Sequence, residues 1–391
     1  MRQRHAVVLS GGGADGAYEV GVVRALVTGR AGACAGRPLV PEVWTGTSIG
    51  SLNAAFLVGS ADGRPEQAVN QLEQLWLDRL ARVSLLDQSD GYRFRLDPTE
   101  LLDAVVRGRR PLDRLRDLAG DGVFVGRMLA HRALHFLTTT KSLGERLIET
   151  ANLSAFVSRE PFRRLLEETI RFDAIRRSPA ALRVSATNWG SGQLRVFGNA
   201  EMTDTLGPLA LMASTAIPGF FPTVEAGAER YVDGGVLMNT PLKPAIAAGA
   251  DVLHVVYLDP DVRDIPLGPF DSILDTMYRM NLIGWAARLD VDIREVRHRN
   301  KLVAQRDVLR QVLERPAIRR AFGASGGLIE ESLEATASWR PLTVHRYHPR
   351  DDLGGPLGLL NVRADRLRGL IARGEEDAVH HDCTASGCVV A

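Results

Sequence analysis

Twice within the first 58 residues, a short segment that reads as a strand, apolar throughout in the first case, ends in a glycine-containing turn and is followed by a helical pattern. The first run, residues 6–9, leads into Ser10 and three consecutive glycines. The second, residues 38–45, leads into the segment Gly-Thr-Ser-Ile-Gly at 46–50. Short apolar runs bounded by turn residues are typical of buried strands. This alternation of strand, turn and helix favours a parallel sheet with helices on both faces.

The rest of the chain supplies further elements for such a sheet. Strands are predicted at residues 182–187, 193–197, 252–258 and 342–347, and helices at 208–214, 273–320 and 362–373. An Arg-rich stretch interrupted by Pro and Gly predicts a helical insertion at about 78–170. We therefore expect one α/β domain over residues 1–380, followed by a loose C-terminal tail at 381–391.

Composition excludes several classes of protein. The 391 residues carry 48 Lys and Arg against 47 Asp and Glu, a net charge of +1, which excludes a chain-wide basic character and predicts no nucleic-acid partner. No apolar run is long enough to span a bilayer as a helix. Three cysteines, Cys34, Cys383 and Cys388, are too few for a disulfide framework and indicate a reducing compartment. We expect a cytoplasmic protein that can associate peripherally with a membrane.

The loop Gly11-Gly-Gly-Ala-Asp-Gly16 lies between the first strand and the first helix. Consecutive glycine N–H groups can point into one space, and the helix N-terminus adds positive partial charge. The loop therefore suits an anion, either a phosphate or a developing oxyanion. Its glycines also fit the dinucleotide fingerprint, but the acidic residue that this fingerprint needs near the second strand is missing. A phosphate- or nucleotide-binding module, with Ser48 structural, is one alternative.

The turn Gly46-Thr-Ser-Ile-Gly50 predicts a nucleophilic serine. Glycines on both sides let the backbone bend sharply and lift Ser48 out at the edge of the sheet. A serine nucleophile needs a base. The Asp233-Gly234-Gly235 segment offers one at a strand end, although such segments are often plain turns.

A histidine base is a second possibility. Chain order allows a triad of Ser48 and Asp233 with His254 or His345. His254 lies within an apolar strand, where a structural role in the core is favoured, and the flank of the last strand favours an exposed His345. The serine turn also follows the second strand, whereas α/β-hydrolases usually place several strands before it. This position counts against a histidine triad.

Four blocks, at residues 10–16, 46–50, 213–222 and 233–241, together resemble the patatin-like phospholipases in order and spacing. The resemblance implies a three-layer α/β/α sandwich around a mainly parallel sheet. It implies a Ser–Asp dyad in which Ser48 is the nucleophile and Asp233 is the base. It assigns the oxyanion hole to the N–H groups of Gly11, Gly12 and Gly13, and it gives supporting roles to Gly16, Gly46, Gly50, Gly234 and Gly235.

The resemblance also implies a substrate class. Members of the family are lipid acyl hydrolases, typically of the phospholipase A type, so a lipid or membrane surface would supply the substrate and no cofactor is expected. Asp15 stands where many members carry Arg or Lys, which weakens the expectation of an anionic head group. Neutral lipids, or other esters and thioesters cleaved by the same dyad, are therefore alternatives.

Three smaller sequence features remain. No cluster of metal ligands with a recognisable spacing occurs, so no metal is expected. The basic cluster Arg107, Arg109 and Arg110 would contact anionic lipid if it lay beside the pocket mouth. The segment Cys388-Val-Val-Ala391 fits the prenylation pattern, although a pattern this short often arises by chance.

Overall fold

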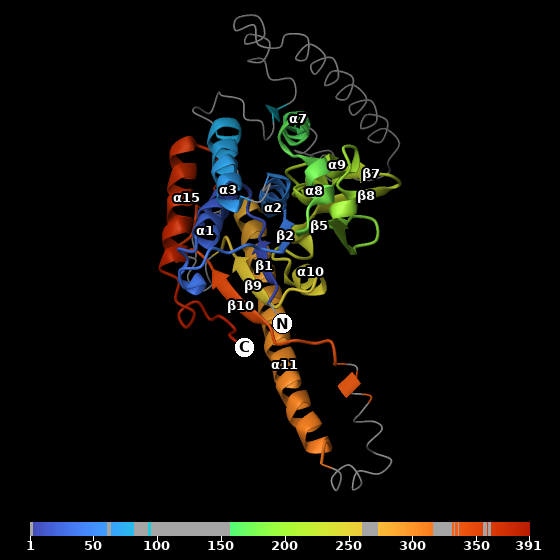
Figure 1. Ribbon diagram of the computed structural model, residues 1–391. Helices are drawn as coiled ribbons and strands as arrows, with labels where there is room; N and C mark the ends of the chain where they lie inside the picture. Colours follow the sequence, from blue (N-terminus) through green and yellow to red (C-terminus); the bar gives the residue numbers. More distant parts are fainter. Residues whose placement is uncertain are drawn as a thin grey trace, which may run out of the picture.

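A mixed eight-stranded sheet lies at the centre of the fold (Figure 1). The computed structural model of the chain describes residues 3–60, 64–81, 93–94, 157–259, 273–315, 331, 333–334, 336–354, 358 and 361–391. The strands of the sheet are β1 (His5–Leu9), β2 (Val43–Thr47), β5 (Ala181–Asn188), β6 (Leu194–Gly198), β7 (Val224–Ala226), β8 (Glu229–Asp233), β9 (Val252–Val256) and β10 (Thr343–Tyr347). Their order is β10-β9-β1-β2-β5-β8-β7, and β6 also pairs with β5.

The half of the sheet that runs from β10 to β5 is parallel, and the pairs that join β5, β6, β7 and β8 are antiparallel. Side chains of β1 alternate between two apolar cores. Val7 and Leu9 pack into one core, and Ala6 and Val8 pack into the other. Both faces of the sheet are therefore covered, which confirms the expected α/β sandwich.

Helices occupy both faces of the sheet. They are α1 (Gly16–Val27), α2 (Ile49–Ser60), α3 (Pro65–Gln74), α7 (Glu160–Thr169), α8 (Phe172–Arg177), α9 (Leu206–Ser214), α10 (Leu242–Ala247), α11 (Ile273–Leu313) and α15 (Ala364–Val379). A π-helical turn, Leu75–Leu80, follows α3, and short 3₁₀ turns lie at Gly13–Asp15, Gly32–Cys34, Asn199–Glu201 and Gly234–Val236. Residues of α1, α2, α3 and α15 line one core, whereas residues of α10 and α11 line the other.

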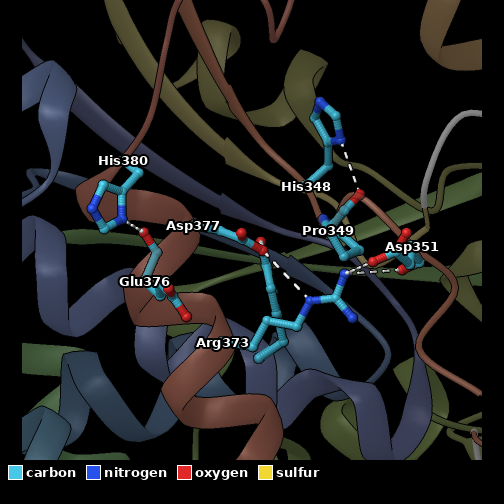
Figure 2. Close-up of polar contacts among 8 residues, drawn as sticks. His348, Pro349, Asp351, Arg373, Glu376, Asp377 and His380 are labelled. Carbon is cyan, nitrogen blue, oxygen red and sulfur yellow. Dashed lines mark hydrogen bonds and ion pairs between the residues drawn. The ribbon is translucent and has the colours of Figure 1, made fainter.

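The helix α15 packs closely against α1, on the face of the sheet that carries the larger core (Figure 1). Tyr18 of α1 donates a hydrogen bond to Asp377 of α15 over 2.9 Å. Arg373 of α15 lies 3.8 Å from the same carboxylate and 3.2 Å from Asp351, which follows β10 (Figure 2). These contacts fix α15 to α1 and to the chain beyond β10.

Several sequence expectations need correction at the C-terminal end. The last helix was expected over 362–373, but α15 continues to Val379 because its apolar face stays buried against α1 as far as Ala378. The tail 381–391 was expected to be loose, but Val389 pairs with Val344 of β10 in both directions, over 2.7 and 2.9 Å. This pairing covers part of an otherwise exposed sheet edge.

The predicted insertion at about 78–170 lies mostly outside the described residues, and so does the Arg107, Arg109 and Arg110 cluster. Within the insertion the structure describes a two-stranded sheet of β3 (Arg93–Phe94) and β4 (Val157–Ser158), followed by α7. Over the described ranges, none of the helices combines the length and the hydropathy that crossing a membrane requires.

Two glycines of α15 provide a matched test of the α1–α15 contact. A Cβ at Gly374 would lie 2.0 Å from the Tyr18 carbonyl oxygen, whereas a Cβ at Gly369 would meet nothing within 4 Å. We expect Gly374→Ala to lower the free energy of unfolding by about 1–3 kcal/mol through overpacking. The control Gly369→Ala should raise it by about 0.5–1 kcal/mol, since alanine favours the helix. Chemical denaturation measures both, and equal effects would contradict this packing.

Candidate active site

Ser48 lies at the carboxyl end of β2, in the turn that leads into α2. Its φ of +54° is unusual for a residue other than glycine, and it marks a strained turn held in place by its surroundings. The Ser48 N–H donates to Ser214 Oγ over 2.9 Å, and Ser214 in turn donates to the Ser185 carbonyl over 2.6 Å. The end of α9 and strand β5 therefore hold the backbone of Ser48 in this orientation.

The glycines of the turn are required by close backbone contacts. A Cβ at Gly46 would lie 2.3 Å from the Gly50 carbonyl oxygen. A Cβ at Gly50 would lie 2.6 Å from the Ser10 carbonyl oxygen, at the start of the glycine-rich loop. The serine turn therefore rests directly on the end of β1.

Asp233 ends the antiparallel strand β8 and meets Ser48 across the sheet. Ser48 Oγ donates a 2.6 Å hydrogen bond to Asp233 Oδ2, although the two residues are 185 positions apart in the sequence. The other carboxylate oxygen, Oδ1, accepts from the Gly235 N–H over 2.7 Å. Gly234 permits this approach, since a Cβ there would lie 2.4 Å from the Ser185 carbonyl oxygen.

The surroundings of Asp233 make it a stronger base than an ordinary carboxylate. Burial raises the pKa of Asp233 to about 6, while the hydrogen bonds from Ser48 and Gly235 and the charge of Arg159 oppose that rise. The group is therefore mainly ionised at neutral pH and has a proton affinity suited to general-base catalysis.

Arg159 is a residue that the sequence interpretation missed. It is 5% exposed, and its guanidinium donates to the Met212 carbonyl over 2.7 Å and to the Thr215 hydroxyl. The rings of Phe162 and Phe221 lie 5.1 and 4.9 Å from its Cζ. Within the sequence, Arg159 is one arginine among many, and nothing in the local pattern places its charge near Asp233.

The glycine-rich loop lies against Ser48, but its three amides are not equivalent. The Gly11 N–H donates to the Asn239 carbonyl over 3.1 Å, so Gly11 does not offer the free amide that was expected of it. A Cβ at Gly11 would lie 3.0 Å from Ser48 Cβ, which shows how closely the loop approaches the serine. Within the described part of the chain, the N–H groups of Gly12 and Gly13 have no hydrogen-bond acceptor.

Asn239 joins the Asp233 block to the glycine-rich loop. In addition to the bond from Gly11, its Nδ2 donates to the Gly11 carbonyl over 3.1 Å. Gly16 packs on Ile49, where a Cβ would lie 2.6 Å from Cγ2. The four sequence blocks therefore meet at one place.

Asp15 of the glycine-rich loop has a basic partner from a distant part of the chain. Arg366 of α15 forms an ion pair with it, with side-chain exposures of 16% for Arg366 and 5% for Asp15. Arg366 also donates to the Leu353 carbonyl over 2.6 Å. Burial raises the pKa of Asp15 to about 7, against the opposing charge of Arg366, so Asp15 adds little negative charge to the loop at neutral pH.

The structure does not bring the candidate histidines to Ser48. His254 is buried in β9, where its ring nitrogens lie 3.4 Å from His5 Nδ1 and 3.2 Å from the Tyr347 hydroxyl. The ring of His345 stacks on that of His254 at a centroid distance of 5.1 Å. The histidine triad is therefore not formed in this structure.

The expectation that no metal ligands cluster also needs correction. Among the described residues, His345, His381, Cys383 and Cys388 come together beside β10, away from Ser48 and Asp233. The sequence spacing hides this group, since pairing of the tail with β10 is what joins residue 345 to the segment 381–388.

Comparisons with known proteins bear on this site. A family model described as patatin-like phospholipase matches residues 7–246. Among solved structures, the chain is similar to VipD from Legionella pneumophila, with 13% identity, a TM-score of 0.34 and coverage of 95% of this chain and 67% of that chain. It is also similar to the type III effector protein ExoU, with 18% identity, a TM-score of 0.30 and coverage of 96% of this chain and 52% of that chain. No match was found among curated proteins.

The electrostatic coupling between Arg159 and Asp233 predicts a pH effect. If Asp233 takes the proton of Ser48, labelling of Ser48 by a fluorophosphonate should slow as the pH falls through about 6, where Asp233 becomes protonated. Arg159→Met removes a charge that favours the carboxylate, so the midpoint of labelling should move to higher pH.

The matched control is Arg163→Met on α7, the helix that begins directly after Arg159, because Arg163 pairs with Glu160 and Glu167 instead. Its labelling midpoint should equal that of the unaltered chain. An unchanged midpoint in a folded Arg159→Met variant would contradict the coupling.

Proposed function

Because this chain belongs to the patatin-like phospholipase family, we propose that it is a serine lipid acyl hydrolase that uses Ser48 as nucleophile and Asp233 as base. One observation carries the proposal. The Ser48 hydroxyl donates to a buried carboxylate over 2.6 Å, beside a loop with two amides that lack an acceptor among the described residues. A nucleophile, a base and an oxyanion site are the parts that acyl transfer requires.

In the first half of the proposed reaction, Ser48 Oγ attacks the carbonyl carbon of an ester. Its proton passes to Asp233 Oδ2 as the new carbon–oxygen bond forms. The tetrahedral intermediate then breaks the bond to the alcohol, and Asp233 returns the proton to the departing oxygen. An acyl-enzyme on Ser48 remains.

In the second half, water enters and attacks the acyl carbon. Asp233 takes a proton from this water, the bond to Ser48 Oγ breaks, and Oγ regains a proton. The fatty acid is released, and the carboxylate of Asp233 is restored. Because the same oxygen of Asp233 serves both halves, no histidine is needed.

The oxyanion of each intermediate is assigned to Gly12 and Gly13. Their N–H groups have no acceptor within the described residues, whereas that of Gly11 is committed to Asn239. Gly13 has a φ of +56°, which favours glycine and orients the loop. Loss of one such donor typically costs about 10²–10³ in kcat.

The substrate is proposed to be an acyl ester drawn from a lipid or membrane surface. Asp15 adds little negative charge to the loop, because Arg366 pairs with it and burial raises its pKa to about 7, so this position does not exclude a head group that carries a phosphate. Neutral lipids and zwitterionic phospholipids therefore both fit the proposal. No cofactor takes part in the steps above.

The function is tested by kinetics on three purified variants. Ser48→Ala should lower kcat by about 10⁶, by comparison with other serine hydrolases. Asp233→Asn should lower it by about 10²–10⁴, since it removes the proton acceptor. Ser60→Ala, at the far end of α2 from Ser48, should leave kcat unchanged.

The assay uses a phosphatidylcholine, a diacylglycerol and a short-chain nitrophenyl ester, so that head-group preference is measured together with catalysis. Half of the activity surviving in Ser48→Ala would overturn the proposal. Binding of inorganic phosphate without hydrolysis of any ester would instead favour a phosphate-binding module.

A further inference from the structure

Two histidines and two cysteines from distant parts of the chain meet beside the edge strand β10. His345 lies on β10, His381 follows α15, and Cys383 and Cys388 belong to the C-terminal segment. One nitrogen or sulfur atom from each of these four residues lies within 4.8 Å of the corresponding atom of every other. The chemistry proposed for Ser48 and Asp233 uses none of them.

Three nitrogen–sulfur distances within this group are close to the edge lengths of a metal-centred tetrahedron. His345 Nδ1 lies 3.4 Å from Cys383 Sγ. His381 Nε2 lies 3.5 Å from Cys383 Sγ and 3.4 Å from Cys388 Sγ. Tetrahedral zinc, with bonds of about 2.3 Å to sulfur and about 2.0–2.1 Å to nitrogen, separates a sulfur from a nitrogen by about 3.6 Å.

Hydrogen bonding alone accounts poorly for these contacts. An imidazole nitrogen carries either one hydrogen or one lone pair. Both sulfurs nevertheless lie almost equally close to His381 Nε2. A cation between the four atoms would satisfy both contacts at once.

The backbone around the four residues is already arranged as a metal site requires. The Arg346 N–H donates to Cys388 Sγ over 3.2 Å, a contact that stabilises a thiolate. The Cys388 N–H donates to the Cys383 carbonyl over 2.9 Å and closes the loop between the two cysteines. The Asp382 carboxylate accepts from the Thr384 N–H over 2.7 Å and holds the start of that loop.

We propose that His345, His381, Cys383 and Cys388 bind one zinc ion in a closed tetrahedral site. A set of two imidazoles and two thiolates is the donor set that zinc prefers in structural sites. Each thiol gives up one proton on binding, and the two thiolates balance the charge of the divalent cation. The site requires no change of oxidation state.

The zinc ion would fasten the C-terminal segment to the sheet. It links β10 to the residues that follow α15, next to the point where Val389 pairs with Val344. The same α15 carries Arg366, the partner of Asp15.

Metal analysis of the full-length chain tests this proposal. The chain, purified without a polyhistidine tag and without added metal, should carry about one equivalent of zinc. Cys383→Ser and Cys388→Ser should each lose most of it. The matched control Cys34→Ser should keep it, because Cys34 lies outside the cluster.

Cobalt substitution gives a second measurement that does not depend on the folding of a variant. The cobalt form of the unaltered chain should show the intense visible bands of tetrahedral coordination and a sulfur-to-cobalt charge-transfer band. Zinc far below one equivalent together with a cobalt spectrum lacking these bands would overturn the proposal. So would a disulfide between Cys383 and Cys388 in freshly isolated chain kept under reducing conditions.

Discussion

The hydrogen bond between Ser48 and Asp233 depends on glycines that let neighbouring backbone segments approach each other closely. A Cβ at Gly46 or Gly234 would lie 2.3 or 2.4 Å from a carbonyl oxygen. Glycine at these positions lets the ends of β2 and β8 converge. The strained backbone of Ser48, with its φ of +54°, persists because these neighbours determine its conformation.

The burial that follows from this close packing sets the chemistry of the site. Asp233 is only 5% exposed, and the loss of water around it is the main reason why its pKa rises to about 6. The charge of buried Arg159 limits that rise, so the carboxylate stays ionised near neutrality. The close packing of these segments therefore accounts both for the strained backbone of Ser48 and for the raised pKa of Asp233.

The sequence predicted the strands β1 and β9 well because each is a short apolar run buried on both faces. It placed the second strand too early, at 38–45, whereas β2 covers Val43–Thr47. It also predicted that Ser48 and Asp233 would meet, through a resemblance spread over four blocks. It did not predict that the amide of Gly11 is committed to Asn239, or that Arg159 lies near Asp233. Such contacts depend on which distant segments become neighbours in the sheet, and local patterns do not encode that order. The pairing of the tail with β10 was missed for the same reason.

The central claim is that the Ser48 hydroxyl attacks the ester and carries the acyl group. The most direct measurement is peptide mass spectrometry of the chain quenched in acid during turnover of a slowly hydrolysed ester. The account predicts one acyl group on the peptide that contains Ser48, with accumulation that precedes release of the fatty acid. An acyl group on any other residue, or rapid hydrolysis with no adduct on Ser48 at any quench time, would contradict it.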